Sequence, residues 1–370
     1  MVNAAPAVYR SGLTDSSRWQ HFSLRPDDIV ISAPSKCGTT WVQMICALLI
    51  FQSTDLPAPL TTVSPWLDMR LRPLADVTRA LDAQQHRRFI KTHTPLDGLP
   101  QLPGVSYVVV GRDPRDVAVS MDHHRNNLDD QLLHRLLTSG EEAPIGPSAA
   151  PQRPASRRER VLQWIHDQRT ATENLDSLRT VVHHLGQAWD RRNEPAVILM
   201  HHADLSQDLA GHMRRLADRL GIEVPPPRWP ALIEAATFAS MRSRAGQLVP
   251  DERLGLFTSE GAFFRSGQAG QWRDVLDDED LAAYDTLIRS LAATDFVDWV
   301  ENGTNVPRQV PACCGGDPAD RACRQVLACA AAAASSTTSG QVTGQPCPPI
   351  RPTARGGHLG VAGQDVGDGA

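Results

Sequence analysis

The chain is organised around the segment Ile29-Val30-Ile31-Ser32-Ala33-Pro34-Ser35-Lys36-Cys37-Gly38-Thr39-Thr40-Trp41. Its β-branched start predicts a buried parallel strand, which Pro34 ends because proline has no amide to donate to a ladder. Residues 41–51 are apolar almost all round, which is typical of a helix buried on most sides. A strand, a turn of small residues and a helix N-terminus together form an anion site, since the first helical amides have no intrahelical acceptor.

The residues of the turn favour phosphate binding. Gly38 lets the backbone approach a phosphate closely, Lys36 adds a full charge, and Thr39 and Thr40 add hydroxyl donors. The turn does not fit the Walker P-loop, because the first glycine is missing and Lys36 precedes Gly38 instead of following it. An ordinary strand-to-helix turn that happens to hold a lysine is the alternative at this point.

The composition is that of a globular protein with room for one large α/β domain. Of 370 residues, 41% are hydrophobic and 21% are charged, which is ordinary for such proteins. The net charge of −5 argues against a nucleic-acid binder, whose affinity comes from positive charge. No signal peptide is visible, and no apolar run approaches the roughly 20 residues of a membrane span. We therefore expect a cytoplasmic protein with no integral membrane segment.

Strand patterns alternate with helix patterns along residues 1–300. The expected strands cover residues 29–33, 88–93, 106–111 and 196–200. The expected helices cover residues 41–51, 76–85, 114–124, 160–191 (as two helices), 204–220, 230–241 and 278–293. This alternation predicts an α/β fold, with a central parallel sheet flanked by helices on both faces. Ligands of such sheets bind beyond the carboxyl ends of the strands.

Two segments lack such patterns. Residues 138–159 are rich in Pro, Ala, Ser and Glu and predict an exposed insertion. Residues 301–370 contain no aromatic side chain and are low in complexity, which predicts a disordered tail because they cannot bury enough apolar surface. We expect free thiols at the five cysteines of this tail, which are Cys313, Cys314, Cys323, Cys329 and Cys347. The predicted organisation is thus a domain of residues 1–300 followed by a tail.

Three further segments resemble motifs of one family. They are Lys91-Thr92-His93-Thr94-Pro95, Val110-Gly111-Arg112-Asp113-Pro114-Arg115-Asp116-Val117-Ala118-Val119-Ser120 and Phe264-Arg265-Ser266-Gly267-Gln268-Ala269-Gly270-Gln271-Trp272. Together with the segment at Lys36, they stand in the order found in the cytosolic-type sulfotransferases, over roughly residues 20–275. The chain resembles that family, and in particular bacterial, actinobacterial glycolipid- or aryl-sulfotransferases. The resemblance implies a P-loop-like three-layer fold.

The resemblance also implies the donor, 3′-phosphoadenosine 5′-phosphosulfate, and its binding residues. The 5′ end would bind to the first loop, at Lys36, Cys37, Gly38, Thr39, Thr40 and Trp41. The 3′-phosphate would bind to Arg112, Ser120, Arg265, Ser266 and Gly267, and the adenine would lie near Trp41, His202 and Phe238. Arginine suits a phosphate because its fork bonds two oxygens at once.

For the reaction, the resemblance implies His93 as the general base and Lys36 as the charge that stabilises the leaving phosphate. Lys91 lies two residues before His93, on the same side of a strand, and would serve the transferring group. We expect no metal, because lysines supply the charge. The adjacent histidine pairs at 123–124, 183–184 and 201–202 are expected to be surface or packing pairs. A P-loop phosphotransferase and a non-catalytic nucleotide-binding protein are the alternatives.

The sequence departs from the family pattern at several positions. Ser35 is interposed before Lys36, Cys37 replaces a usual serine, and His202 stands where a tyrosine is usual. The family's dimerisation motif is not recognisable in residues 273–282, so the oligomeric state is open. The expected acceptor is a small hydroxyl compound, which could be a phenol, an alcohol, a sugar or a glycolipid. Its apolar body would contact variable loops that carry Trp66, Leu67, Met69, Leu254 and Phe257.

Overall fold

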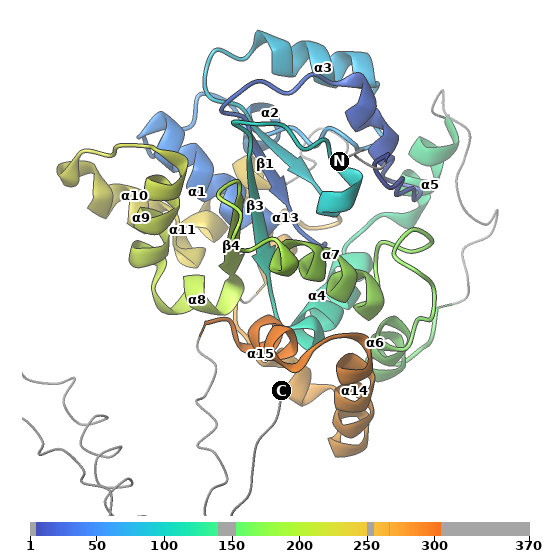
Figure 1. Cartoon of the computed structure of the whole chain (residues 1–370). Helices are drawn as coiled ribbons and strands as arrows, with labels where there is room; N and C mark the ends of the chain where they lie inside the picture. Colours follow the sequence, from blue (N-terminus) through green and yellow to red (C-terminus); the bar gives the residue numbers. More distant parts are fainter. Residues whose placement is uncertain (1–4, 140–152, 250–254, 266, 305–370) are drawn as a thin grey trace, which may run out of the picture. The chain divides into compact units, whose positions relative to one another are not determined.

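The computed structural model describes residues 5–139, 153–249, 255–265 and 267–304. Its centre is a sheet of four parallel strands in the order β2-β1-β3-β4 (Figure 1). The strands are β1 (Ile29–Ser32), β2 (Phe89–Thr92), β3 (Ser106–Gly111) and β4 (Val197–His201). Ile29 pairs with Phe89 on one side and with Ser106 on the other. The segments that follow β1, β2 and β3 therefore emerge at the same edge of the sheet.

Helices and short 3₁₀ turns connect and cover the strands. The α-helices are α1 (Thr39–Phe51), α2 (Leu60–Val63), α3 (Leu74–Ala83), α4 (Pro114–Asn126), α5 (Asp130–Ser139), α6 (Arg157–Ile165), α7 (Leu178–Asp190), α8 (His202–Gln207), α9 (Leu209–Leu220), α10 (Trp229–Ala235), α11 (Phe238–Ser243), α12 (Ala245–Leu248), α13 (Glu260–Phe263), α14 (Asp278–Leu291) and α15 (Thr294–Asn302). The 3₁₀ turns are η1 (Ser16–His21), η2 (Leu96–Gly98), η3 (Pro226–Arg228) and η4 (Gln271–Asp274).

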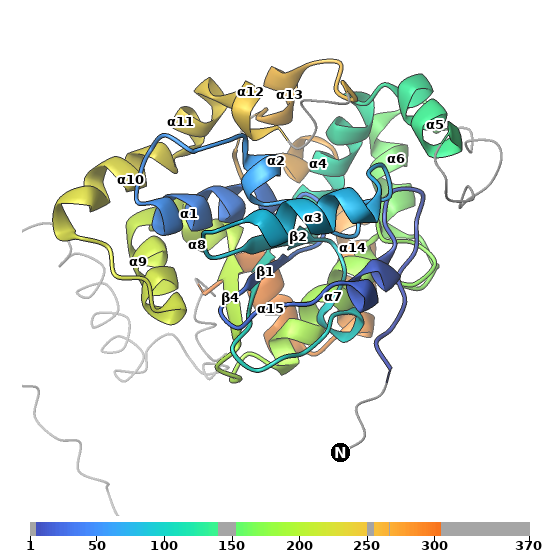
Figure 2. The same ribbon diagram turned by 90° about the horizontal axis from the view of Figure 1, so that it is seen from above.

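Helices cover both faces of the sheet. The helix α1 packs against β1 and β2, whereas α7 packs against β3 and β4. Figure 2 shows α1 and α7 on opposite sides of the strands. Every residue of β1 and β2 is buried, which is why these strands carry no exposed polar face. The prediction of a three-layer α/β fold with a central parallel sheet is confirmed.

Two predicted long helices are each divided into two. The helix predicted over residues 204–220 breaks at Asp208, whose side chain accepts a hydrogen bond from the amide of Gly211 at 2.8 Å. The helix predicted over residues 230–241 breaks at Thr237, whose hydroxyl accepts from the amide of Ser240 at 3.2 Å. Both residues are good N-caps, and a cap competes with helix continuation. Hydrophobic periodicity continues across both breaks and therefore did not reveal them.

Among the helices that were not predicted, α5 and α15 shift two predicted boundaries. The helix α5 ends at Ser139 and α6 begins at Arg157, so the predicted insertion at 138–159 overlaps a helix at each end. Its remaining centre, residues 140–152, lies outside the described residues. The helix α15 runs to Asn302, past the predicted domain end at residue 300. Residues 305–370 of the predicted tail lie outside the described residues.

A buried ion pair lies at the amino ends of β1 and β2. The guanidinium of Arg88 donates from Nε to Oδ1 of Asp28 at 2.8 Å, and both side chains are almost fully buried. The ring of Phe22 covers the guanidinium, with 4.8 Å between the ring centroid and Cζ. Breaking such a pair leaves a buried charge without a partner, which costs about 3–5 kcal/mol. The pair thus pins the amino ends of β1 and β2 together.

Candidate functional site

The loop between β1 and α1 has an unusual backbone. Lys36 has φ of 66° and Gly38 has φ of 113°, so both residues are in the left-handed region. These two left-handed residues turn the backbone between β1 and α1, and α1 begins directly afterwards at Thr39. The hydroxyl of Thr39 is buried and has no hydrogen-bond partner among the described residues. The loop therefore presents helical amides and an unsatisfied hydroxyl at one point.

Positive charge gathers beside this loop. The Nζ atom of Lys36 lies 4.4 Å from the ring centroid of Phe263. Burial and, after it, the nearby cations of Arg112 and Lys91 lower the pKa of Lys36 to about 7. A lysine whose charge is this unfavourable needs an anion to restore it. The electrostatics of the site thus favour an anionic ligand.

His93 follows β2 and has a defined tautomer. Its Nδ1 atom lies 2.6 Å from the carbonyl oxygen of Ala33. Because a carbonyl can only accept, Nδ1 carries the proton and Nε2 has the lone pair of the neutral ring. Burial, followed by the charge of Lys91, holds the pKa of His93 well below its usual value. At neutral pH the ring is therefore uncharged, with one nitrogen able to accept a proton.

Residues 66–68, for which no helix or strand was predicted, brace both sides of His93. The carboxylate of Asp68 accepts hydrogen bonds from the hydroxyls of Thr92 at 2.6 Å and Thr94 at 2.5 Å. The ring of Trp66 lies 4.8 Å from the ring of His93 and edge-on to it, and 4.3 Å from Nζ of Lys91. No periodic pattern marks this segment, so its bracing contacts could not be predicted from the sequence.

Arg112, just beyond β3, contacts both the loop between β1 and α1 and the segment of residues 267–272. Its guanidinium donates to the carbonyl oxygens of Lys36 at 3.2 Å and Gln268 at 3.4 Å. Its Nε atom is buried without a hydrogen-bond partner among the described residues. The carboxylate of the next residue, Asp113, pairs with Arg115 at 2.9 Å. Arg112 thus lies between two loops and has a donor to spare.

Two carboxylates at the amino end of α4 hold the segment of residues 270–272. Asp116 accepts from the amides of Gly270 at 2.8 Å and Gln271 at 2.9 Å. Asp113 accepts from Nε1 of Trp272 at 3.1 Å. Sequence reasoning found both segments but missed these contacts between them. The contacts explain why the Arg265 loop lies beside Arg112.

The residues predicted to surround the adenine also lie together. Nε1 of Trp41 donates to the carbonyl of Ala236 at 2.8 Å, and its ring lies 5.3 Å from that of His202. Two residues after Ala236, the ring of Phe238 lies against Gly267. A Cβ at Gly267 would meet this ring at 2.6 Å, and φ of 64° there also favours glycine. The predicted nucleotide residues therefore line one continuous region.

The other predicted 3′-phosphate residues make fewer contacts. Ser120 is half-buried on α4, and its hydroxyl has no hydrogen-bond partner among the described residues. Arg265 is mostly exposed. Its partial burial, followed by the positive charges of Arg157 and Arg112, lowers its pKa. Ser266 lies outside the described residues. The cluster of arginines around Arg265 supports an anion site.

The prediction that residues 123–124 form a surface or packing pair is incomplete. His124 lies 5.5 Å from Phe257, ring to ring. Its pKa is held well below the usual value by burial and by the charges of Lys36 and Lys91. His124 therefore lies near Lys36, Lys91 and His93, although its sequence neighbours gave no sign of it.

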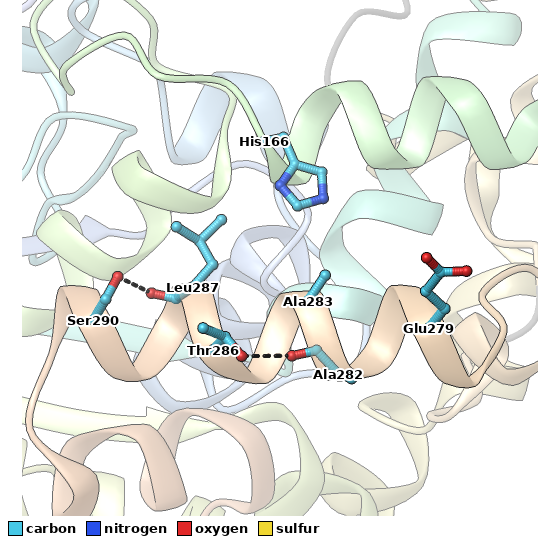
Figure 3. A pocket seen from close by; sticks show the side chains of 7 residues that line it. All are labelled: His166, Glu279, Ala282, Ala283, Thr286, Leu287 and Ser290. Atoms are coloured by element: carbon cyan, nitrogen blue, oxygen red, sulfur yellow. Dashed lines mark hydrogen bonds between the residues drawn. The ribbon is translucent and has the colours of Figure 1, made fainter.

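No cluster of His, Cys, Asp and Glu among the described residues could hold a metal ion. Among the same residues, no helix is long and apolar enough to cross a membrane. An open groove beside α14 shares no residue with the four motifs (Figure 3). It is lined by His166, Glu279, Ala282, Ala283, Thr286, Leu287 and Ser290.

Comparison with known proteins supports one family. A glycolipid sulfotransferase from Mycobacterium tuberculosis is 42% identical over 307 residues, which cover 80% of this chain and 94% of that protein. The luciferin sulfotransferase of Photinus pyralis is 24% identical over 75% of each chain. Among solved structures, retinol dehydratase in complex with retinol and PAP has a TM-score of 0.57 at 22% identity, over 76% of this chain and 87% of that one.

A mouse sulfotransferase complexed with PAP has a TM-score of 0.55 at 19% identity, over 77% of this chain and 91% of that chain. At such identities the structural likeness shows the fold. The sulfotransferase domain family itself matches residues 26–296, which contain all four motif segments described above. The chain therefore belongs to the sulfotransferase family.

Proposed function

We propose that this protein transfers a sulfuryl group from 3′-phosphoadenosine 5′-phosphosulfate to a hydroxyl of a small organic or glycolipid acceptor. The observation that carries the proposal is the free Nε2 of His93, held beside two lysines at the end of β2. The mycobacterial relative, named a glycolipid sulfotransferase, supports the acceptor class. The two solved relatives that hold PAP support the donor. Membership of the family argues against the phosphotransferase alternative.

The unsatisfied groups of the site fit such a donor. The buried hydroxyl of Thr39 and Nε of Arg112 each have a hydrogen bond left to donate. In the proposal, Lys36 to Trp41 hold the 5′ end, and Arg112, Ser120 and the Arg265–Gly267 loop hold the 3′-phosphate. Trp41, His202 and Phe238 contact the adenine.

The proposed reaction follows from these positions. The donor supplies a sulfuryl group activated by its bond to phosphate. Nε2 of His93 takes the proton of the acceptor hydroxyl while that oxygen bonds to sulfur. The bond between sulfur and the phosphate oxygen breaks, and its electron pair leaves on the phosphate. Lys36 stabilises this charge, and Lys91 stabilises the charge on the transferring oxygens.

Replacement of His93 tests the proposal. We expect His93→Ala to lower turnover of radiolabelled donor by roughly 10² or more, because the hydroxyl loses its proton acceptor. The rise in melting temperature caused by PAP should be unchanged, since His93 is not assigned to the donor. Arg112→Ala is the matched control, and it should lose most of that rise.

An active His93→Ala enzyme would refute the assignment of the base. Stabilisation by PAP without turnover of any acceptor by the wild type would favour the non-catalytic alternative.

A further inference from the structure

The helix α4 carries residues of both sides of the site. His124 follows Ser120 by four residues, so the two side chains lie one helical turn apart on the same face. The ring of His124 lies 5.5 Å from Phe257 and 6.3 Å from Phe263. Phe263 in turn lies under Nζ of Lys36. One aromatic ring therefore separates His124 from the lysine of the anion loop.

The ring nitrogens of His124 have no hydrogen-bond partner among the described residues. Two other histidines near the site each have one bonded ring nitrogen. His93 donates to Ala33, and His184 shares a hydrogen bond of 2.8 Å with the hydroxyl of Ser32. A neutral imidazole offers one donor and one acceptor, and on the half-buried His124 both remain available to a ligand. His124 is thus equipped to bind a polar group of a ligand.

The wall beside His124 is preformed. Asn127, at the end of α4, accepts with Oδ1 from the hydroxyl of Thr258 at 2.8 Å and the amide of Ser259 at 3.0 Å. Its Nδ2 donates to the carbonyl of Ser259 at 2.8 Å. Phe257 also forms a β-bridge with Leu128. These contacts hold the ring of Phe257 beside His124, so that a polar group and apolar rings form one surface.

The charges around His124 select the kind of group it can bind. Burial disfavours a proton on its ring, and the positive charges of Lys36, Lys91 and Arg125 have the same effect. The neutral imidazole suits a hydroxyl, which can both donate and accept. An anionic group of the acceptor would instead be attracted to the lysines. The apolar rings of Phe257 and Phe263 suit the less polar face of a sugar ring.

We infer that His124 is a specificity-determining residue, which hydrogen-bonds a second hydroxyl of the acceptor beside the one that is sulfated. The acceptor class is then a polyhydroxylated, sugar-like molecule and not a simple phenol or monohydric alcohol. This inference rests on the proposed function and narrows its acceptor.

The probes are octyl glucoside and its monodeoxy analogues, each lacking one hydroxyl. Calorimetry in saturating PAP measures their binding to wild type and to His124→Phe. We expect wild type to bind octyl glucoside about tenfold or more tightly than one of the analogues, because a site built to bond a hydroxyl rejects a ligand without it. His124→Phe should bind the parent and that analogue alike. His134→Phe, at an exposed site on α5, should behave as wild type.

Three results would overturn the inference while leaving the proposed function intact. They are no binding of octyl glucoside by a wild type that binds PAP, equal binding of all analogues by wild type, and continued discrimination by His124→Phe. Failure of wild type to bind PAP at all would instead refute the proposed function. Because His124 is not assigned to the donor, the affinity of His124→Phe for PAP should match that of wild type.

Discussion

Lys36 combines a left-handed backbone, a buried ammonium group and two neighbouring cations. Each of these is unfavourable in the free protein, and such strain concentrates at functional sites. An anion beside Nζ would relieve two of them, because it restores the charge and screens the cations. The cost of forming the site is thus offset when the donor binds.

This electrostatic arrangement predicts proton uptake on donor binding. The pKa of Lys36 is about 7 in the free protein, and a bound phosphate raises it. Above pH 7 the free lysine is therefore partly neutral and takes up a proton when PAP binds, so PAP affinity falls as pH rises from there. Calorimetry at pH 8, in buffers of different ionisation enthalpy, measures this uptake.

Two variants distinguish proton uptake by Lys36 from changes that any loss of PAP affinity would cause. Lys36→Met should abolish the proton uptake. Arg112→Ala should weaken binding and reduce the uptake only in part, because Lys36 still titrates although it has lost one cation that lowers its pKa. Equal uptake by wild type and Lys36→Met would assign the proton to another group.

At the scale of elements, the site depends on contacts between segments far apart in the chain. The amino end of α4 binds the loop before η4 through Asp116, over 150 residues away. This contact holds Gly270 and Gln271 beside the amino end of α4. The bracing of His93 by Asp68 is a second contact of this kind.

Removing the charge of Asp116 tests the first of these contacts. Asp116→Asn has one acceptor oxygen in place of two, so one of the amides of Gly270 and Gln271 loses its partner. We expect a loss of about 1–2 kcal/mol, seen as roughly tenfold weaker PAP binding. Faster hydrogen exchange at these two amides should accompany it.

Asp129→Asn is the control, because Asp129 also accepts from two amides, those of Gln131 and Leu132, at a half-buried position directly before α5. It should leave PAP affinity unchanged. If Asp116→Asn bound PAP as tightly as wild type, the Arg265 loop would not need this anchor.

At the scale of the whole molecule, the parallel order β2-β1-β3-β4 brings Lys36, His93 and Arg112 to one edge of the sheet. The described chain ends close to β4. Asp204 accepts from the amide of Thr304 at 3.0 Å, and α15 buries Phe296, Trp299 and Val300. The last helix is therefore part of the folded unit. The cytoplasmic location stays a prediction from the sequence.

Truncation tests the predicted boundary between domain and tail. Removing residues 306–370 should leave the melting temperature and PAP binding unchanged, because that segment lacks aromatic residues and core-forming periodicity. Removing residues 294–370 instead takes away α15 and should lower the melting temperature strongly. A large loss with the shorter deletion would show that the tail contributes to the fold.

The sequence by itself determined the sheet and the place of the site. Short β-branched runs such as 29–31 and 107–110 predicted buried strands, and the turns after them predicted where charge gathers. These signals are local, because strand burial and turn chemistry depend on neighbouring residues. The helix breaks at Asp208 and Thr237 were within reach of the same reasoning, since both residues are N-caps.

Only the tertiary structure decided how the segments meet. It placed His124 beside Phe257 and Lys36, gave His93 its tautomer through Ala33, and joined Asp116 to Gly270. Each of these contacts joins residues 60 or more positions apart. Such contacts depend on how helices and loops pack over the sheet edge, and no local pattern of residue types encodes that packing.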